Sequence, residues 1–193
     1  MKNEGKKRPS SPFSFFGSLK GLCLAAILTA MSILLGKFLQ IPNPFQEFIR
    51  ISFENLPIIL GGIALGPVAG ACIGISADLL GCVLYAYTIN PIITLGAAVV
   101  GVLSGLFPNY IVRRPLEAKV ALSVIPAHLI GSVLIKSIGL ASWYLAKYEI
   151  GLTEFILWRL ANYALISAAE CVILYILLKN RAFSRQLEGL LKK

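Results

Sequence analysis

Residues 67–87 read PVAGACIGISADLLGCVLYAY, and this stretch decides the fold of the chain. It holds one charged residue, Asp78, in a length that suits a transmembrane helix of about 20 apolar residues. The whole chain of 193 residues shares this character, being 57% hydrophobic and only 14% charged. Soluble domains are about 45–50% apolar and about 25% charged, so an ordinary soluble domain is excluded. The high apolar content also excludes a disordered chain.

Six apolar runs predict an all-α integral membrane protein built as a six-transmembrane-helix bundle. The runs cover residues 17–39, 52–65, 67–87, 92–112, 120–145 and 154–178. The second run spans only about 20 Å, so we expect that it does not cross the full hydrocarbon core. The membrane domain is therefore predicted at 17–179, between an N-terminal tail at 1–16 and a C-terminal tail at 180–193.

The basic residues predict the orientation of the bundle. Thirteen of the 18 lysines and arginines lie near the N-terminus, between the fourth and fifth runs, or near the C-terminus. In a six-helix protein these segments share one side, which the positive-inside rule assigns to the cytoplasm. Both termini are therefore predicted to be cytoplasmic, in a multi-pass protein of a bacterial cytoplasmic membrane. The net charge of +9 reflects this topology and not a nucleic-acid partner.

Small residues at four-residue spacing predict where helices approach one another in lipid. Two glycine series have this spacing, namely Gly62, Gly66, Gly70 and Gly74, and then Gly101 and Gly105. For these glycines we expect internal packing. Ala26 and Ala30 in the first run have the same spacing and few polar neighbours. Their stripe faces either another helix of this chain or a partner protein in the membrane.

Polar and ionisable residues inside the apolar runs are candidates for function, because such groups are costly in a membrane. With neighbouring aromatic residues they give ten candidate binding residues: Arg50, Phe53, Asn55, Asp78, Tyr85, His128, Lys136, Trp143, Arg159 and Asn162. An acid, cations, amides and aromatic rings toward the outward side are the chemistry of a cavity for a ring-bearing anion.

Most of these candidates also have a structural explanation. The alternatives are anchoring at the membrane surface for Lys136, Arg159 and Trp143, helix capping for Asn55, and a core position for His128. Glu170 is expected to meet an internal partner. Asp78 is harder to explain structurally, since a carboxylate at mid-membrane must pair with a basic residue or with a ligand donor.

Several enzyme classes lack their required residues in this sequence. There is no P-loop motif, so the chain is not expected to hydrolyse ATP by that route. A single histidine and the absence of a cysteine cluster leave no plausible zinc site, and no cofactor is implied. Asp78 is the one aspartate, whereas a metal-dependent phosphotransferase needs several acids. Binding or transport is therefore the favoured class of function.

Three short motifs resemble one membrane protein family. They are RISFENLPI at 50–58, GPVAG at 66–70 and ADLLG at 77–81. They resemble the S component, the substrate-binding subunit, of energy-coupling factor (ECF) vitamin transporters, and most closely the folate-specific branch. The resemblance implies a six-helix subunit that works with a transmembrane T component and two ATPase subunits, and that topples in the membrane. It also implies that Ala26 and Ala30 dock the T component and that the loop 40–49 is a lid.

Folate suits the candidate residues on chemical grounds. Asp78 can accept the two adjacent N–H groups of a pterin edge, and Lys136, Arg159 or Arg50 can meet the glutamate tail. Other flat heterocycles, such as a queuosine precursor, riboflavin or thiamine, are the alternative ligands. A membrane enzyme or a structural membrane subunit is the alternative from another class.

Overall fold

The computed structural model describes residues 18–42, 50–108, 115–148 and 150–191. The predicted tail at 1–16 and most of the predicted lid, 43–49, lie outside the described residues. The described helices are α1 Leu19–Phe38, α2 Asn55–Leu65, α3 Pro67–Leu84, α4 Pro91–Leu106, α5 Leu116–Pro126, the π-helix η3 Ala127–Ile135, α6 Lys136–Tyr148, α7 Leu152–Lys179 and α8 Arg181–Leu191. The predicted helical fold is confirmed, with one small antiparallel ribbon of β1 Ile41–Pro42 and β2 Arg50–Ile51.

Each of the six predicted runs contains a helix, because α5, η3 and α6 follow one another as one rod. Four helical segments are long and apolar enough to cross a membrane, namely Leu19–Phe38, Pro67–Leu84, Leu116–Ala141 and Leu152–Lys179. Helix α2 and helix α4 are shorter. After Leu106 the chain stays helical, in π form, through Pro108, and the predicted end at residue 112 lies outside the described residues. The count of six spans therefore stays a prediction.

The breaks between helices follow from local chemistry. Gly66 has φ 100°, a left-handed conformation that favours glycine, and it separates α2 from α3. Pro67 and Pro91 each stand in the first turn of a helix, where a missing N–H costs nothing. Pro126 closes α5, and the π-helix η3 begins directly after it, since proline removes a backbone donor from the helical ladder.

Glycine contacts hold α2, α3 and α4 together. A methyl group on Gly70 would lie 2.4 Å from the carbonyl oxygen of Gly101, and one on Gly74 would lie 2.3 Å from that of Ala97. A methyl group on Gly62 would lie 2.1 Å from the hydroxyl oxygen of Ser104. The prediction of internal packing is confirmed for these glycines, because only a missing side chain permits such close backbones.

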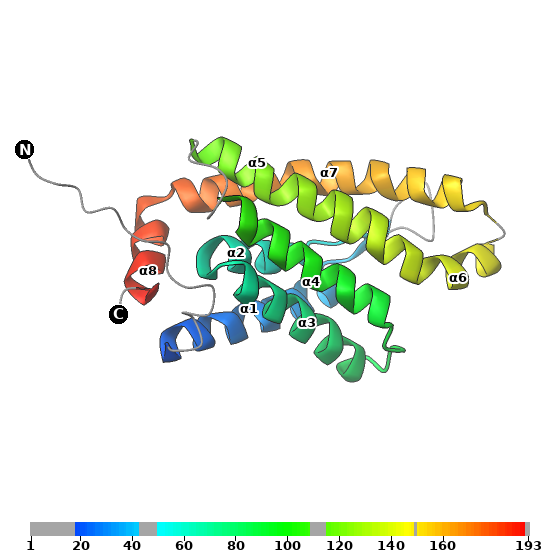
Figure 1. Ribbon diagram of the computed structural model, residues 1–193, viewed down its shortest axis with the longest axis horizontal. Helices are drawn as coiled ribbons and strands as arrows, with labels where there is room; N and C mark the ends of the chain where they lie inside the picture. The colour runs from blue at the N-terminus through cyan, green and yellow to red at the C-terminus, as the bar shows by residue number, and fades with distance from the viewer. Residues whose placement is uncertain (1–17, 43–49, 109–114, 149, 192–193) are drawn as a thin grey trace, which may run out of the picture.

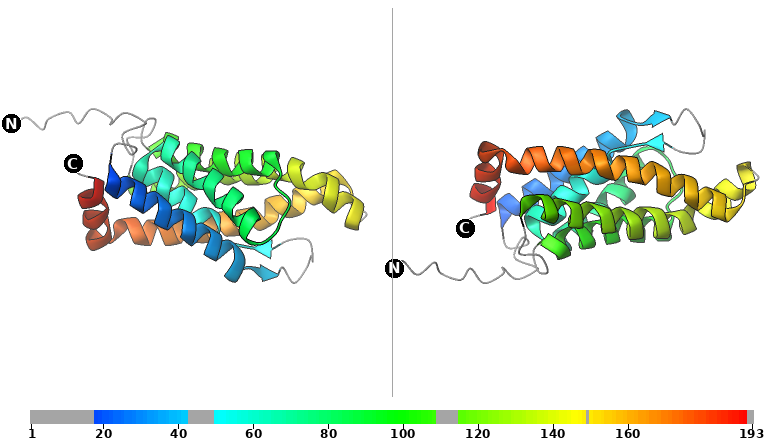
Figure 2. Two further views of the ribbon diagram at one scale, coloured as in Figure 1. Left: turned by 90° about the horizontal axis from the view of Figure 1, so that it is seen from below. Right: turned by 90° about the horizontal axis from the view of Figure 1, so that it is seen from above.

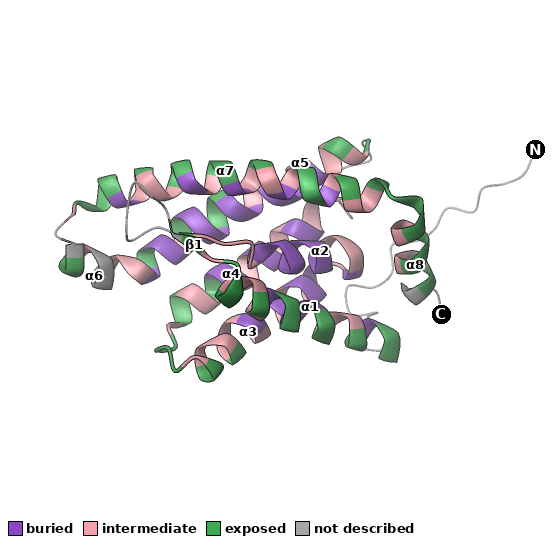
Figure 3. Ribbon diagram, turned by 180° about the vertical axis from the view of Figure 1, so that it is seen from behind, coloured by how far each residue is buried: buried purple, intermediate pink, exposed green. Residues whose placement is uncertain are grey.

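The helices form an elongated bundle in which α7 lies beside the α5–η3–α6 rod and α1 to α4 pack against that pair (Figure 1). Helix α8 crosses the end of the bundle where α7 ends and α1 begins, as both views of Figure 2 show. Helix α2 is the centre of the core, with nine of its 11 residues buried (Figure 3). The outer faces carry exposed leucines and isoleucines, which suits a lipid environment.

Candidate functional site

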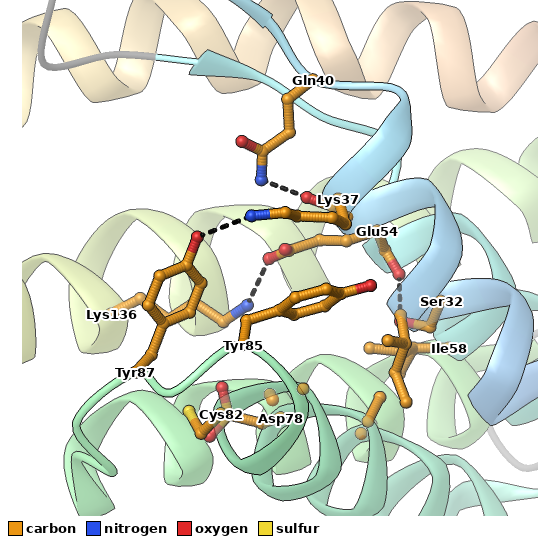
Figure 4. Close-up of a pocket in the computed structure, with 16 residues that line it drawn as sticks. Ser32, Lys37, Gln40, Glu54, Ile58, Asp78, Cys82, Tyr85, Tyr87 and Lys136 are labelled. Carbon is orange, nitrogen blue, oxygen red and sulfur yellow. Dashed lines mark hydrogen bonds and ion pairs between the residues drawn. The ribbon is translucent and has the colours of Figure 1, made fainter.

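A cavity of about 130 Å³ lies at the end of α1 farthest from α8. Its walls come from α1, the start of α2, α3, α4 and α6. Its charged and aromatic lining consists of Lys37, Glu54, Asp78, Tyr85, Tyr87 and Lys136 (Figure 4). Three of the ten predicted residues, Asp78, Tyr85 and Lys136, therefore line one cavity although they are far apart in sequence.

Asp78 on α3 is half-buried in the cavity wall and pairs with a neutral partner. The Thr94 hydroxyl donates to Asp78 Oδ2 at 2.6 Å, and Thr94 is positioned on the first turn of α4. Asp78 forms no ion pair within the described part of the chain, so of its two predicted partners, a basic residue or a ligand donor, the ligand donor stays a prediction. A carboxylate held by one hydroxyl at a cavity wall can still accept hydrogen bonds from a ligand.

Lys136 points into the cavity and pairs with Glu54. Its Nζ lies 3.0 Å from Glu54 Oε1 and 3.5 Å from Asn55 Oδ1. The Lys136 side chain is only 7% exposed, so the alternative in which it extends to the membrane surface does not hold. Asn55 does not cap α2, because its side chain makes these tertiary contacts instead. Glu54 was not among the predicted site residues.

Lys37 and two tyrosines form the mouth of the cavity. Lys37 Nζ lies 4.7 Å from the ring centre of Tyr85 and 3.3 Å from the hydroxyl of Tyr87. Gln40 donates to the carbonyl of Gly36, and its own side-chain oxygen accepts from Arg50 Nη1 at 2.9 Å. The end of α1 is thereby tied to strand β2, and sequence reasoning missed Lys37, Gln40 and Tyr87.

His128 belongs to a buried hydrogen-bonded group behind the cavity. His128 Nε2 lies 2.6 Å from Glu170 Oε2, and His128 Nδ1 lies 3.3 Å from Ser132 Oγ. Asn55 Nδ2 donates to the same Ser132 hydroxyl at 3.3 Å. The expected internal partner of Glu170 is therefore His128, and His128 occupies the core position that was its structural alternative.

Arg159, Asn162 and Phe53 are not among the residues that line the cavity. Arg159 Nη2 donates to the carbonyl of Ser132 at 2.7 Å, and Asn162 Nδ2 donates to the carbonyl of Arg50 at 3.3 Å. Phe53 is half-buried and packs against the central apolar cluster. The side chain of Trp143 lies outside the described part of the structure.

Within the described residues, no group of three histidine, cysteine or acidic side chains is placed to hold a metal ion. The four cysteines are free thiols on different parts of the helices. The chemistry that the cavity offers is therefore that of hydrogen bonding, charge and aromatic stacking.

The chain belongs to the family described as "ECF transporter, substrate-specific component", because residues 20–179 match it. The family resemblance of the three motifs is thereby confirmed. A curated relative, the folate transporter FolT of Clostridium novyi (strain NT), is 33% identical over 85 residues. That match covers 42% of this chain and 46% of the relative, so about half of each protein is compared.

Two solved structures share the fold. "Crystal structure of FolT bound with folic acid" superposes with a TM-score of 0.64 at 22% identity, covering 82% of this chain and 92% of that one. "Structure and mechanism of the S component of a bacterial ECF transporter" superposes with a TM-score of 0.56 at 22% identity, covering 89% and 97%. At this identity the likeness establishes the fold of a transporter S component.

Proposed function

We propose that this protein is a high-affinity folate-binding subunit of an ATP-driven vitamin transporter. The observation that carries the proposal is the Asp78–Thr94 pair in the wall of a cavity that also presents Tyr85. The partial match to FolT supports folate as the ligand. The chain binds the vitamin, and separate subunits hydrolyse ATP.

In this proposal Asp78 hydrogen-bonds to the pterin edge of the ligand. A pterin presents a ring N–H beside an amino group, and a carboxylate accepts both in a two-point hydrogen bond. Thr94 fixes the carboxylate through Oδ2, which reduces the freedom that binding would otherwise remove. Tyr85 lines the same cavity and offers a ring on which the flat pterin stacks.

The glutamate tail of folate meets cations at the mouth of the cavity. Lys136 is already paired with Glu54, and Arg159 donates to a backbone carbonyl behind the cavity. Lys37 is exposed at the mouth, and Arg50 is also exposed and joined to the same region through Gln40. Lys37 and Arg50 are therefore the cations that the tail carboxylates reach first.

Binding of folate requires the mouth to open. The cavity of about 130 Å³ is small beside the about 300–1,000 Å³ of typical ligand pockets. It accommodates a ring and not a whole folate molecule. The Lys37–Tyr85–Tyr87 group closes the side toward β2, so these three side chains move when the ligand enters.

The T component docks against the outer face of α1. Ala26 and Ala30 are exposed there, while Leu28, Thr29 and Ser32 on the other face of the helix are buried. Small exposed residues permit close helix approach in lipid. In this proposal six spans place both termini in the cytoplasm, and the subunit topples against the T component and its two ATPases to release the ligand.

Calorimetric titration of the purified, detergent-solubilised chain tests the ligand. Folate, riboflavin, thiamine and a queuosine precursor are titrated in turn into protein that gel filtration shows to be monodisperse. Tight binding of folate alone supports the proposal. Heat from another heterocycle but not from folate would keep the transporter class and reject the pterin assignment. No heat from any of them would reject folate and the three alternative heterocycles as ligands.

Bulky residues on the α1 stripe test the docking surface. Ala26→Trp and Ala30→Trp are expected to abolish folate uptake in cells that hold the complete transporter, while folate binding to the purified subunit stays within about twofold. Leu157→Trp, at an exposed apolar site on α7, is the matched control and should retain uptake. Loss of binding in the alanine variants would show that the stripe packs internally.

A further inference from the structure

A line of buried side-chain hydrogen bonds runs from the cavity to the middle of α7. Its members, in order, are Glu54, Lys136, Asn55, Ser132, His128 and Glu170. They come from α2 and the turn before it, from α6, from η3 and from α7. Four of them, from Asn55 to Glu170, are at most 1% exposed, so this chain of contacts is sealed within the described protein.

The cavity end of the line sets the orientation of Asn55. Lys136 Nζ can only donate, so the atom of Asn55 that faces it at 3.5 Å is the amide oxygen. The amide nitrogen then faces Ser132 Oγ at 3.3 Å and donates to it. A reversed amide would bring two donors together, so Lys136 fixes this side chain.

The same direction continues to Glu170. Ser132 Oγ accepts from Asn55, which leaves its own proton free to be donated to His128 Nδ1, 3.3 Å away. We assign this arrangement, in which His128 Nδ1 accepts and Nε2 carries the proton that is donated to Glu170 Oε2 at 2.6 Å. From Lys136 onward every donor points toward the Glu170 carboxylate, and Lys136 also donates in the other direction, to Glu54 Oε1.

Other polar groups around His128 limit how it can rearrange. The ring of Tyr163 on α7 packs against the His128 ring, with 5.3 Å between their centres. The Arg159 guanidinium group lies over the same tyrosine ring, 5.2 Å from its centre. Arg159 also holds the backbone carbonyl of Ser132. Since η3 places His128 and Ser132 four residues apart in a π-helix, both side chains reach the same side of the rod.

We propose that His128 and Glu170 are positioning residues for the ligand cavity. They act through Ser132 and Asn55 to hold the Lys136 ammonium group against Glu54 in the cavity wall. A change at Glu170 on α7 therefore alters the ligand site without touching it. This inference rests on the proposed function only in assigning the cavity to a ligand.

The burial of these groups argues against a merely structural role. Buried ion pairs and polar networks are often no more stable than an apolar replacement of the same shape. Glu170 carries an additional cost, because its Oε1 has no hydrogen-bond partner among the described residues. A core position at α7 with no link to the cavity would be filled at lower cost by leucine.

Nitrogen-15 NMR of the labelled histidine tests the line without any ligand. His128 is the only histidine in the sequence, so its ring signals need no assignment. The full chain in detergent is expected to show a neutral ring protonated at Nε2. Lys136→Met should shift these signals, whereas Thr94→Val, a change in the same cavity but outside the line, should leave them in place. A ring protonated at Nδ1, or equal responses to both variants, would overturn the proposal.

A double-mutant cycle then tests the link to binding, with folate as the probe. Glu170→Gln and Ser132→Ala are each expected to weaken folate binding by about 2- to 30-fold. The double variant should be no weaker than the more affected single variant, since both interrupt one line. Fully additive losses would overturn the proposal. If the wild-type chain does not bind folate, the proposed ligand is rejected. The ligand-free NMR result still tests whether the line of hydrogen bonds connects Lys136 with His128.

Discussion

Two of the carboxylates inside the helical bundle, Glu170 and Asp78, differ in their surroundings. Glu170 is fully buried and pairs with His128, whereas Asp78 is half-buried in a cavity wall and accepts a hydrogen bond from the Thr94 hydroxyl. The first carboxylate has its countergroup within the protein. The second can still accept hydrogen bonds from a ligand in the cavity. An ionisable group in an apolar run therefore indicates a ligand site only when its partner and its exposure are known.

The largest effect is expected from separating the Glu170 pair. His128→Leu leaves a buried carboxylate without its hydrogen-bond donor, which costs about 1–3 kcal/mol and more for a charged group. We expect a corresponding loss of thermal stability in detergent, and recovery of most of it when Glu170→Leu is added. Asp78→Leu is the matched comparison at the half-buried carboxylate. If Asp78→Leu destabilised the protein as strongly, the two acids would not differ in the way described.

A smaller effect is expected at the hydroxyl that orients Asp78. Thr94→Val keeps the shape of the side chain and removes a hydrogen bond worth about 0.5–1.5 kcal/mol. Folate affinity should fall by about 2- to 13-fold, with the melting temperature little changed, as measured by calorimetry and thermal unfolding. An unchanged affinity would mean that Thr94 does not prepare Asp78 for the ligand.

The smallest effect is expected at the exposed mouth. Lys37→Gln removes one partly solvated charge interaction, worth about 0.2–1 kcal/mol, so folate should bind up to about fivefold more weakly. Binding of pteroate, which lacks the glutamate tail, should not change. Lys20→Gln at the opposite end of α1 is the matched control. Equal losses of affinity for folate and pteroate would show that Lys37 shapes the mouth of the cavity and does not bind the glutamate tail.

The sequence predicts the helices well because long apolar runs and their proline and glycine breaks are local features. Gly66 and Pro67 mark a real boundary, and the glycine spacing anticipates the α2–α3–α4 contacts. The ends of helices are harder to predict, because α4 ends at Leu106, two residues before Pro108, although the apolar run continues to residue 112 in the sequence.

The site is only partly predictable from the sequence. Asp78 and Lys136 stand out because charge is rare within apolar runs. Lys37 and Tyr87 stand at helix ends, where polar residues are ordinary, and the 50 residues between them hide their contact. Glu54 adjoins the predicted Asn55, but only the tertiary approach of α6 shows that it is the partner of Lys136.

Folate titration of the Asp78→Asn variant tests whether Asp78 accepts hydrogen bonds from the pterin edge of folate. The asparagine keeps the size of the side chain but replaces one acceptor with a donor and removes the charge. Hydrogen bonds to charged groups contribute about 1.5–3 kcal/mol, so folate affinity should fall by about 10- to 150-fold with the fold intact. Wild-type affinity in a folded Asp78→Asn variant would show that Asp78 does not bind the pterin edge of folate.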